Sequence, residues 1–191
     1  MDQTTISIGK KALMVLNAGL LTILAPRHLE RLEEVERILK KESILWLRKT
    51  SLTPGTGRSD QEHPEVILLD IMGELVGLYS LGTLVFVGGS LVPIGGHNPL
   101  EPLFFRKCVL FGPYMFNFFE ISIRLIETGG AIQVSGKKEL FSQLKRLLFD
   151  EVSRKEVGER GYQFLQKHQG ATKRMFEEIR PYLSRIQNAK L

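Results

Sequence analysis

The residues in this sequence that could do chemistry gather in one stretch, residues 88–102, which reads GGSLVPIGGHNPLEP. Asn98 is a residue type that caps helices, Pro99 suits the first helical position, and Glu101 follows the cap as in a capping box. A helix is therefore expected to begin here. Its first turn offers unpaired N–H groups, and the glycines before it would let an anion approach the backbone. The stretch is either a phosphate cradle or a purely structural turn, and the residues alone leave both open.

The same stretch lacks the patterns of other chemistries. It has neither the GxGxxG pattern of dinucleotide-binding folds nor the GxxxxGK[ST] pattern of P-loop proteins. His97 has no adjacent carboxylate partner and no second ligand for a metal, and the other histidines show no metal-ligand spacing. We therefore expect His97 to have a hydrogen-bonding or loop-ordering role, and we expect neither a metal nor a cofactor.

Three other stretches place similar residues where a strand or turn is expected to end. Arg27 follows an apolar run and could form bidentate bonds to phosphate, or it is simply solvated. Asp70 and Gly73 follow another run, where Asp70 could merely cap the next helix. Asn117 precedes Glu120 by three residues, which is a further capping pattern. Each signal is weak alone, but four such turns on one edge of a sheet would form a nucleotide pocket.

The elements that must position these residues are short apolar runs that alternate with segments of helical period. This alternation is typical of a parallel sheet sandwiched between helices. The runs are apolar throughout, as expected for strands that are covered on both faces. They occupy residues 20–24, 44–47, 66–69, 84–87, 108–111 and 131–134. The expected fold is α/β with a Rossmann-like, doubly wound parallel sheet, in which ligands bind beyond the carboxyl ends of the strands.

Helices are expected between and after these runs. Apolar residues recur at three- and four-residue steps over residues 29–39, and residues 137–150 and 151–169 are also helical in pattern. Residues 52–65 carry turn formers without an apolar period, which indicates a surface loop. A last amphipathic helix is predicted after Gly170. Its apolar positions are Met175, Ile179, Tyr182, Leu183 and Ile186.

Composition limits the classes of protein. A length of 191 residues fits one domain, and 26 Lys and Arg against 21 Asp and Glu give a formal net charge of +5. This charge favours anionic partners but is too small to choose among phosphates, nucleic acid and acidic lipids. The single cysteine, Cys108, excludes a disulfide framework and a cysteine metal cluster. A reducing, cytosolic compartment is the expected one.

The early apolar stretch at residues 12–25 is not expected to cross a membrane. It is shorter than the roughly 20 apolar residues of a membrane span, and Asn17 and Gly19 interrupt it. Lys10 and Lys11 precede it as in a signal peptide, but no stretch of small residues follows for cleavage. We predict that this stretch is a passage from a helix into a strand.

Taken in order, these motifs resemble the 3-deoxy-D-manno-octulosonic acid (Kdo) transferases of Gram-negative lipopolysaccharide synthesis. The resemblance rests on LLTILAPRHLER, VILLDIMGEL, FVGGSLVPIGGHNPLEP, GPYMFNFFEI and QGATKRMFEEIRPYL. It runs from about Leu20 to Leu183, which is most of the chain, and the block from GGS to GGHNPLEP is highly specific.

The resemblance implies the GT-B fold, in which two Rossmann-like domains face each other and the C-terminal one holds the donor CMP-Kdo. Residues 20–191 look like that C-terminal domain, and residues 1–19 are an atypical N-terminal segment. By the family's pattern, the contacts to CMP fall on Pro26, Arg27, Met72, Gly73, Glu74, Asn98, Pro99, Leu100 and Glu101. Three of the four turns described above supply these residues.

Two departures from the family's pattern matter. The N-terminal domain, which supplies the catalytic carboxylate, the lipid-acceptor surface and the membrane anchor, is absent here, so the catalytic residues are unknown. The Ser-Thr-His loop that normally follows the first strand of the C-terminal domain is also absent, and TTISIGKKALM stands in its place. We therefore expect the sheet to lack its central strand or to recruit Ile6–Ile8 instead.

The expected function is transfer of Kdo from CMP-Kdo to lipid A precursor, with this chain as the donor-binding half, inactive alone. The chain is then a fragment, a degenerate domain, or one subunit of a split enzyme whose N-terminal half is separate. We expect it in the cytoplasm, peripheral to the inner membrane, with no nucleic-acid partner. The alternatives are a non-catalytic nucleotide-binding or interaction module and another GT-B enzyme that uses a UDP-sugar.

Overall fold

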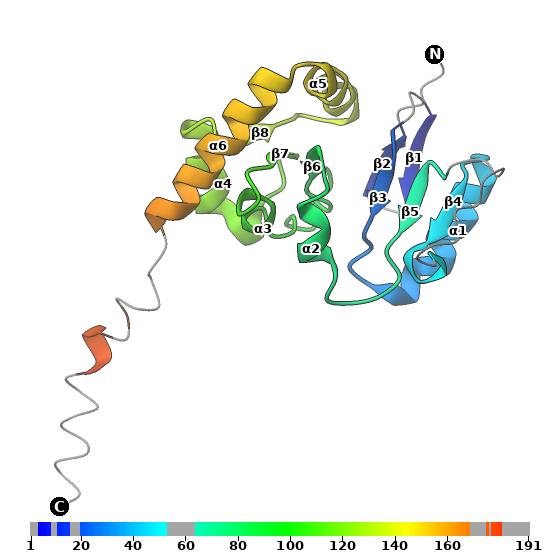
Figure 1. The fold of residues 1–191 in the computed structure, drawn as a ribbon, viewed down its shortest axis with the longest axis horizontal. Helices are drawn as coiled ribbons and strands as arrows, with labels where there is room; N and C mark the ends of the chain where they lie inside the picture. The colour runs from blue at the N-terminus through cyan, green and yellow to red at the C-terminus, as the bar shows by residue number, and fades with distance from the viewer. Residues whose placement is uncertain are drawn as a thin grey trace, which may run out of the picture.

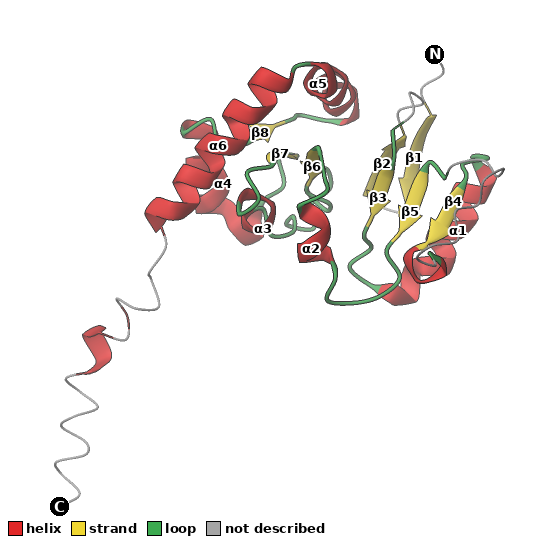
Figure 2. Ribbon diagram, in the orientation of Figure 1, coloured by secondary structure: helices red, strands yellow, loops and turns green. Residues whose placement is uncertain are grey.

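The structure of the 191-residue chain is a computed structural model. It describes residues 20–52, 64–168, 175 and 177–180, together with the backbone of residues 4–8 and 11–15 (Figures 1 and 2). The strands are β1 (Thr4–Ile8), β2 (Lys11–Val15), β3 (Thr22–Leu24), β4 (Trp46–Arg48), β5 (Val66–Leu68), β6 (Leu84–Phe86), β7 (Cys108–Phe111) and β8 (Ile132–Gln133). The α-helices are α1 (Leu32–Lys41), α2 (Leu75–Tyr79), α3 (Leu100–Leu103), α4 (Phe119–Glu127), α5 (Lys137–Phe149) and α6 (Glu151–His168). Short 3-10 helices are η1 (Leu29–Arg31), η2 (Lys49–Ser51) and η3 (Phe116–Phe118).

The first half-sheet is three-stranded and parallel, in the order β3-β5-β4 (Figure 1). Helix α1 covers it because the apolar stripe of this helix buries Leu32, Val35 and Leu39 against Val66 and Leu68 of β5. The charged residues of α1 lie on its other side. The middle strand β5 is buried along its whole length, as predicted for a run that is apolar throughout.

The second half-sheet is also parallel, in the order β6-β7-β8 (Figure 2). Successive residues of a strand point to opposite faces, and β7 uses both faces. Val109 and Phe111 pack in one cluster with α3, α4 and α6, whereas Cys108 and Leu110 pack in another with α5. Burial raises the pKa of the Cys108 thiol to about 11. This cysteine is therefore an unreactive part of the core.

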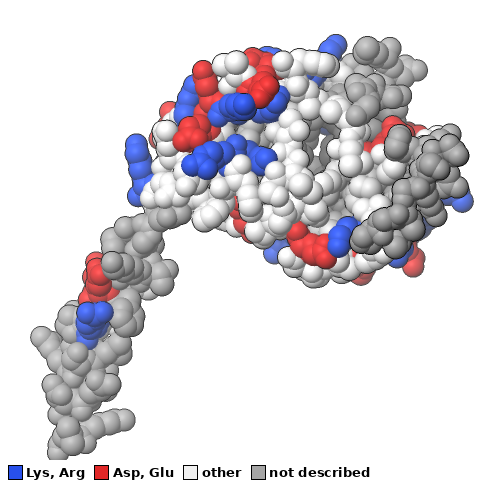
Figure 3. All heavy atoms as spheres, viewed as in Figure 1, with Lys and Arg blue, Asp and Glu red and all other residues white. Residues whose placement is uncertain are grey.

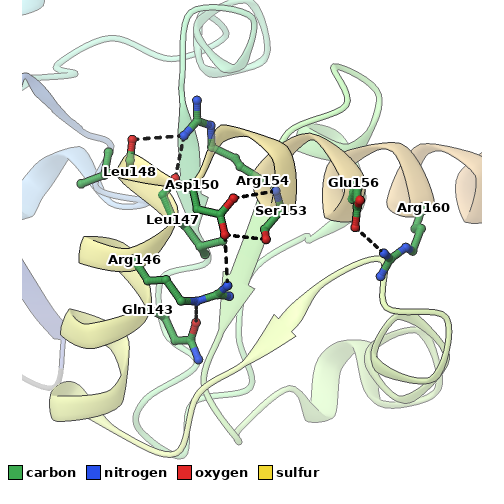
Figure 4. Close-up of polar contacts among 9 residues, drawn as sticks. All are labelled: Gln143, Arg146, Leu147, Leu148, Asp150, Ser153, Arg154, Glu156 and Arg160. Atoms are coloured by element: carbon green, nitrogen blue, oxygen red, sulfur yellow. Dashed lines mark hydrogen bonds and ion pairs between the residues drawn. The ribbon is translucent and has the colours of Figure 1, made fainter.

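A hydrogen-bonded joint connects α5 to α6 (Figure 4). The Asp150 carboxylate accepts hydrogen bonds from the Ser153 N–H at 3.0 Å and from the Ser153 hydroxyl at 2.6 Å, which is the arrangement of an N-cap. Arg154 donates to the carbonyls of Leu147 and Leu148 at 2.6 and 3.2 Å, where the end of α5 leaves carbonyls without helical partners. The joint fixes the angle between the two long helices that cover β7.

The two half-sheets are not joined by a ladder within the described residues. β3 pairs only with β5, and β6 pairs only with β7. The residues of β3 and β6 are half-buried, whereas those of β5 and β7 are buried. No hydrophobic cluster of the described residues contains members of both half-sheets. The α/β class with parallel strands is confirmed, and the doubly wound sheet is interrupted between β3 and β6, as expected for a sheet without its central strand.

Residues 4–15 form a hairpin beside the sheet. β1 pairs with β2 in antiparallel register, with Ile6 opposite Leu13, and the backbone of β1 lies next to α1. Ile6–Ile8 are therefore not recruited as the central strand. The helix predicted at the start of residues 12–25 is wrong, because Lys11–Val15 form β2. A short apolar run such as ALMV does not separate helix from strand by its own period, and cross-strand pairing decides the outcome.

The other elements follow the sequence closely. Each of the predicted strands is present with its ends shifted by two residues at most, and the three longer helices form where they are expected. Most of the predicted loop at 52–65 lies outside the described residues, as does the last predicted helix apart from residues 175 and 177–180, which are helical. No helix of the described residues is long and apolar enough to span a membrane.

Candidate functional site

The predicted contact residues lie on three turns beyond the carboxyl ends of strands. Pro26 and Arg27 follow β3, and residues 72–74 follow β5. Because β3 and β5 are parallel neighbours, both turns leave the first half-sheet at the same edge. Residues 98–101 lie at the start of α3, after the long glycine turn that follows β6.

One side-chain contact joins the turns of the two half-sheets. Nη1 of Arg27 lies 3.4 Å from Nδ1 of His97, and the His97 N–H donates to the Gly88 carbonyl at 3.2 Å. Arg27 is exposed, and a guanidinium has five donors, so this contact leaves donors for an anion. The contacts of His97 agree with the loop-ordering role predicted for it, and they hold Arg27 next to the start of α3.

The glycines at the end of the long turn are used by the protein itself. Gly95 and Gly96 have φ angles of +100° and +69°, which other residues rarely adopt. A Cβ on Gly95 would overlap the Asn117 side chain, and a Cβ on Gly96 would overlap the sulfur of Met115. Asn117 donates to the Gly96 carbonyl at 3.3 Å and does not cap α4, so the capping role predicted for Asn117 is wrong. At these two glycines the stretch is therefore a structural turn and not a phosphate cradle.

Gly73 is the contrasting case. Its φ of +89° also requires glycine, yet no heavy atom of the described residues lies within 4 Å of the place where a Cβ would be. The neighbouring Met72 side chain is 72% exposed. The backbone of this turn is therefore open to a ligand that needs close approach.

Asn98 and Glu101 together organise the start of α3. Oδ1 of Asn98 accepts a hydrogen bond from the Leu100 N–H at 3.0 Å, and Nδ2 donates to Oε1 of Glu101 at 3.0 Å. The helix start is confirmed, although α3 begins at Leu100 and not at Pro99. The predicted capping box is not formed, because Glu101 accepts from the side-chain amide of Asn98 and not from its main chain. The Glu101 carboxylate is thereby fixed at the helix start.

Two contacts that the sequence did not reveal hold the turn after β5. Nζ of Lys49 lies 2.5 Å from Oε2 of Glu74. The Asp70 carboxylate accepts hydrogen bonds from the Thr50 N–H at 3.0 Å and from its hydroxyl at 2.5 Å, so Asp70 does not cap α2 and that prediction is wrong. Desolvation raises the pKa of Asp70, but the Thr50 hydrogen bonds outweigh it and the pKa lies below its ordinary value. Lys49 directly follows β4, so inspection of every strand end would have found it.

Tyr79 connects the turn after β5 with α3. Burial, together with the negative charge of Glu101, raises the pKa of Tyr79 to about 12. Tyr79 ends α2, which begins directly after Glu74 and contacts α3. Together with the Arg27 contact to His97, this proximity brings the three turns into one neighbourhood.

Two hollows on the described surface do not coincide with the predicted contact residues. A hollow of about 280 Å³ lies between α4 and α6 and shares only Leu100 with the predicted residues. A wider hollow of about 620 Å³ lies over α1 and Trp46 and shares none of them. An anion is held by main-chain N–H groups and cations and does not need a deep cavity, so the turns, and not these hollows, are the candidate site.

Comparison with known proteins decides the family. A 3-deoxy-D-manno-octulosonic acid transferase from Haemophilus influenzae is 40% identical over 176 residues, which cover 92% of this chain and 40% of the relative. One from Chlamydia trachomatis is 31% identical over 169 residues, which cover 88% of this chain and 38% of the relative. The crystal structure of the C-terminal CMP-Kdo binding domain of WaaA from Acinetobacter baumannii matches with a TM-score of 0.68 and 30% identity, covering 77% of this chain and 74% of that one. The chain belongs to the Kdo transferase family.

Membership of the Kdo transferase family makes the chain a member of a glycosyltransferase family and agrees with the expected GT-B half. The chain spans about two fifths of the length of these curated transferases. A bifunctional glycosyltransferase/methyltransferase from Fusobacterium nucleatum is also similar, at 36% identity over 71% of this chain and 21% of that protein. No family model matches the sequence.

Proposed function

We propose that this chain is the donor-binding half of a Kdo transferase and binds CMP-Kdo at the three turns. The observation that carries the proposal is the meeting of an exposed arginine, an open glycine turn and a helix start at one edge, at Arg27, Gly73 and Leu100. The choice of donor is supported by the A. baumannii domain, which is named for CMP-Kdo binding.

Each group has a physical role in this proposal. The Arg27 guanidinium and the main-chain N–H groups around Gly73 would neutralise the phosphate of CMP, with charge-assisted hydrogen bonds as the strongest contacts. The Glu101 carboxylate, held by Asn98, would accept hydrogen bonds from the ribose hydroxyls. The remaining proposed contacts are Pro26, Met72, Glu74, Asn98, Pro99 and Leu100. The pair between Lys49 and Glu74 would keep the Glu74 charge from repelling the phosphate.

The proposed activity of the complete enzyme is the transfer of Kdo from CMP-Kdo to lipid A precursor. CMP leaves as an anion, so the preorganised positive charge of Arg27 would lower the barrier to its departure. The general base and the acceptor surface would come from an N-terminal domain, and we assign no catalytic residue to this chain. Residues 20–191 would form the donor domain, with residues 1–19 as a segment outside it.

The proposed place of action is the cytoplasmic face of the inner membrane, because lipid A precursor is a membrane lipid. The net charge of +5 would favour approach to anionic headgroups. The N-terminal domain would be supplied by another part of the protein or by a separate polypeptide. Nucleic acid is not among the proposed partners.

Calorimetric titration of the chain with CMP and with UDP tests the donor site. We expect CMP to bind more tightly than UDP, and Arg27→Ala to raise the Kd for CMP by about tenfold, or about 1.4 kcal/mol. Arg37→Ala is the matched control, because Arg37 is an exposed arginine on α1 whose guanidinium donates to the Glu33 carbonyl, and it should leave the Kd unchanged.

Two outcomes would replace the proposal. A clear preference for UDP would favour another GT-B enzyme that uses a UDP-sugar. CMP affinity that is unchanged in both Arg27→Ala and Glu101→Ala would favour a non-catalytic interaction module. Transfer activity measured after mixing with a separately produced N-terminal half would support the split enzyme.

A further inference from the structure

The edge of β3 that faces away from β5 carries main-chain groups that no described strand bonds. The Thr22 N–H donates to the Glu65 carbonyl and the Leu69 N–H donates to the Leu24 carbonyl, both at 2.9 Å. The main-chain groups of Thr22 and Leu24 therefore point toward β5. In a parallel ladder the N–H and C=O of alternate residues point to the same side. Ile23 therefore directs its N–H and its C=O away from β5, where no strand of the described residues pairs.

The same reasoning applies to β6. The Val87 N–H donates to the Leu110 carbonyl of β7 at 2.9 Å, so the main-chain groups of Val87 and Val85 point toward β7. The alternate residues Leu84 and Phe86 therefore direct their N–H and C=O groups to the other side. Their side is open in the described part of the chain. The interruption in the sheet is thus bordered by Ile23, Leu84 and Phe86, whose main-chain groups have no strand partner among the described residues.

Apart from Thr22, the side chains of the two strands along the interruption are apolar, and all are incompletely covered. β3 and β6 are half-buried at every position, although both flank strands that are fully buried. The space-filling view shows the surface hollowed between the two half-sheets (Figure 3). Main-chain N–H and C=O groups that lack hydrogen-bond partners beside apolar side chains raise the free energy of the fold. An open strand edge is also a template on which another strand can pair.

The direction of the missing strand follows from its neighbours. β3 and β6 are each parallel to their partners, and the turns beyond their carboxyl ends meet at the contact between Arg27 and His97. A strand between them would run parallel to both. It would be apolar on both faces, because strands inside a doubly wound sheet are covered on both sides. It would span roughly three to six residues, since strands of this length are common and its neighbours are short.

We propose that a parallel, apolar β-strand of a second polypeptide inserts between β3 and β6 and joins the two half-sheets. The choice of that polypeptide rests on the proposed function: it is the part of a Kdo transferase that the match to this chain leaves out, which is the greater part of the H. influenzae relative. The slot itself depends only on the open edges. Strand addition of this kind obtains affinity from main-chain hydrogen bonds and specificity from alternate side chains.

Amide hydrogen exchange tests the insertion at single residues. The probe is the part of the H. influenzae transferase outside the match, mixed with the full isotope-labelled 191-residue chain. We expect the amides of Ile23, Leu84 and Phe86 to slow by at least about tenfold, because they gain strand partners. The amides of Thr22 and Leu24 should change less, since they already face β5.

A pair of proline variants separates insertion from general stability. Ile23→Pro removes an N–H that points into the slot and should abolish binding of the probe. Gln133→Pro is the matched control, because the ladder bond of Val134 to the Phe111 carbonyl places the Gln133 N–H on the outer edge of β8. It should leave binding unchanged. Should Ile23→Pro fail to fold, Leu84→Pro makes the same test from the β6 side.

Three results would overturn the proposal. The probe could fail to bind the folded chain, or it could bind while slowing exchange at other residues only. Protection of Ile23, Leu84 and Phe86 that appears in the chain alone and rises with its concentration would mean that a second copy fills the slot. CMP titration is a separate measurement: loss of CMP binding with intact strand insertion would overturn the donor site and not the slot.

Discussion

The two glycine turns of the candidate site look alike in sequence and differ in what surrounds them. Gly95 and Gly73 both have positive φ angles and both precede helices. Beside Gly95 the place of a Cβ is filled by Asn117, which also bonds the neighbouring Gly96 carbonyl. Beside Gly73 no atom of the described part of the chain lies within 4 Å of the same place. A glycine-rich turn therefore identifies a backbone shape, and only the space beside it indicates a ligand.

This difference assigns separate tasks to the two turns. The turn at Gly95 is packed from beneath and supports the start of α3, where Asn98 and Glu101 are fixed. The turn at Gly73 has an exposed neighbour in Met72 and is held from the side by the contacts of Lys49 with Glu74 and of Asp70 with Thr50. Substitutions in the first turn should change folding, and substitutions in the second should change binding.

The largest expected effect is that of Gly95→Ala. The new Cβ must displace Asn117 and the residue must hold φ near +100°, so the free energy of unfolding should fall by about 3 kcal/mol. Urea denaturation measures the change. The double variant Gly95→Ala with Asn117→Ala removes the overlap, and it should be less destabilised than the sum of the two single variants. An additive result would mean that Asn117 is not the obstacle.

Gly73→Ala should weaken CMP binding more than it destabilises the fold. The new Cβ meets no atom of residues 20–52 and 64–168, so the positive φ is the expected cause of destabilisation, by about 1 kcal/mol. The added methyl group would stand where the proposed phosphate approaches the backbone, and the Kd for CMP should rise by about tenfold, or about 1.4 kcal/mol. Calorimetry with CMP measures this change.

Gly77→Ala is the matched control for that variant. Gly77 lies within α2, its Cβ position is also open, and its φ is ordinary. Alanine is the better helix former, so the variant should be up to about 1 kcal/mol more stable and bind CMP as the wild type does. Equal losses of CMP affinity in the two variants would contradict a ligand site at Gly73.

The sequence predicted the strands and the strand-end turns because these depend on local pattern. The runs that became β5 and β7 are apolar throughout, and burial on both faces is the physical reason. The capping roles of Asp70 and Asn117 failed for a different reason. Their partners are Thr50 and Gly96, which lie 20 and 21 residues away in the chain and become neighbours only in the folded sheet.

The amino-terminal region shows the same limit. The apolar run at the start of residues 12–25 favoured a helix, and its outcome as β2 depends on pairing with β1 across a turn. The resemblance to the Kdo transferases anticipated the missing central strand, because it showed which motif was absent. It did not show that β3 and β6 would keep open edges, since this depends on the hydrogen-bond register of each half-sheet.

Lys49→Met tests whether charge balance belongs to the Gly73 turn. The variant keeps the length of the side chain but leaves the Glu74 carboxylate without its cation, close to the proposed phosphate. The Kd for CMP should rise about threefold at low salt and less at high salt, because salt screens exposed charges. Adding Glu74→Gln should restore the affinity. A Lys49→Met effect that persists unchanged in the Glu74→Gln background would mean that Lys49 acts on CMP directly.

The smallest expected effect concerns the hydrogen bonds of Asp70 at the same turn. Desolvation raises the pKa of Asp70. The hydrogen bonds from Thr50 favour the ionised form, and the pKa lies below its ordinary value. A carboxyl whose folded pKa is lowered stabilises the fold above its unfolded pKa, near 3.8, and this stability is lost as pH falls through the folded pKa. Thr50→Val removes the hydroxyl donor. Its cost should be a few tenths of a kcal/mol at pH 7, since the pair is exposed, and should shrink below about pH 4.

Thr128→Val is the matched control for this pH dependence. The Thr128 hydroxyl donates to the Arg124 carbonyl at 2.8 Å, and a carbonyl does not titrate. Its cost in urea denaturation should therefore be equal at pH 7 and pH 3, whereas the cost of Thr50→Val should differ between them. If both costs were independent of pH, the Thr50 hydroxyl would not favour the ionised Asp70. The Thr50 N–H would then remain as the donor that holds the Asp70 carboxylate beside the turn at Gly73.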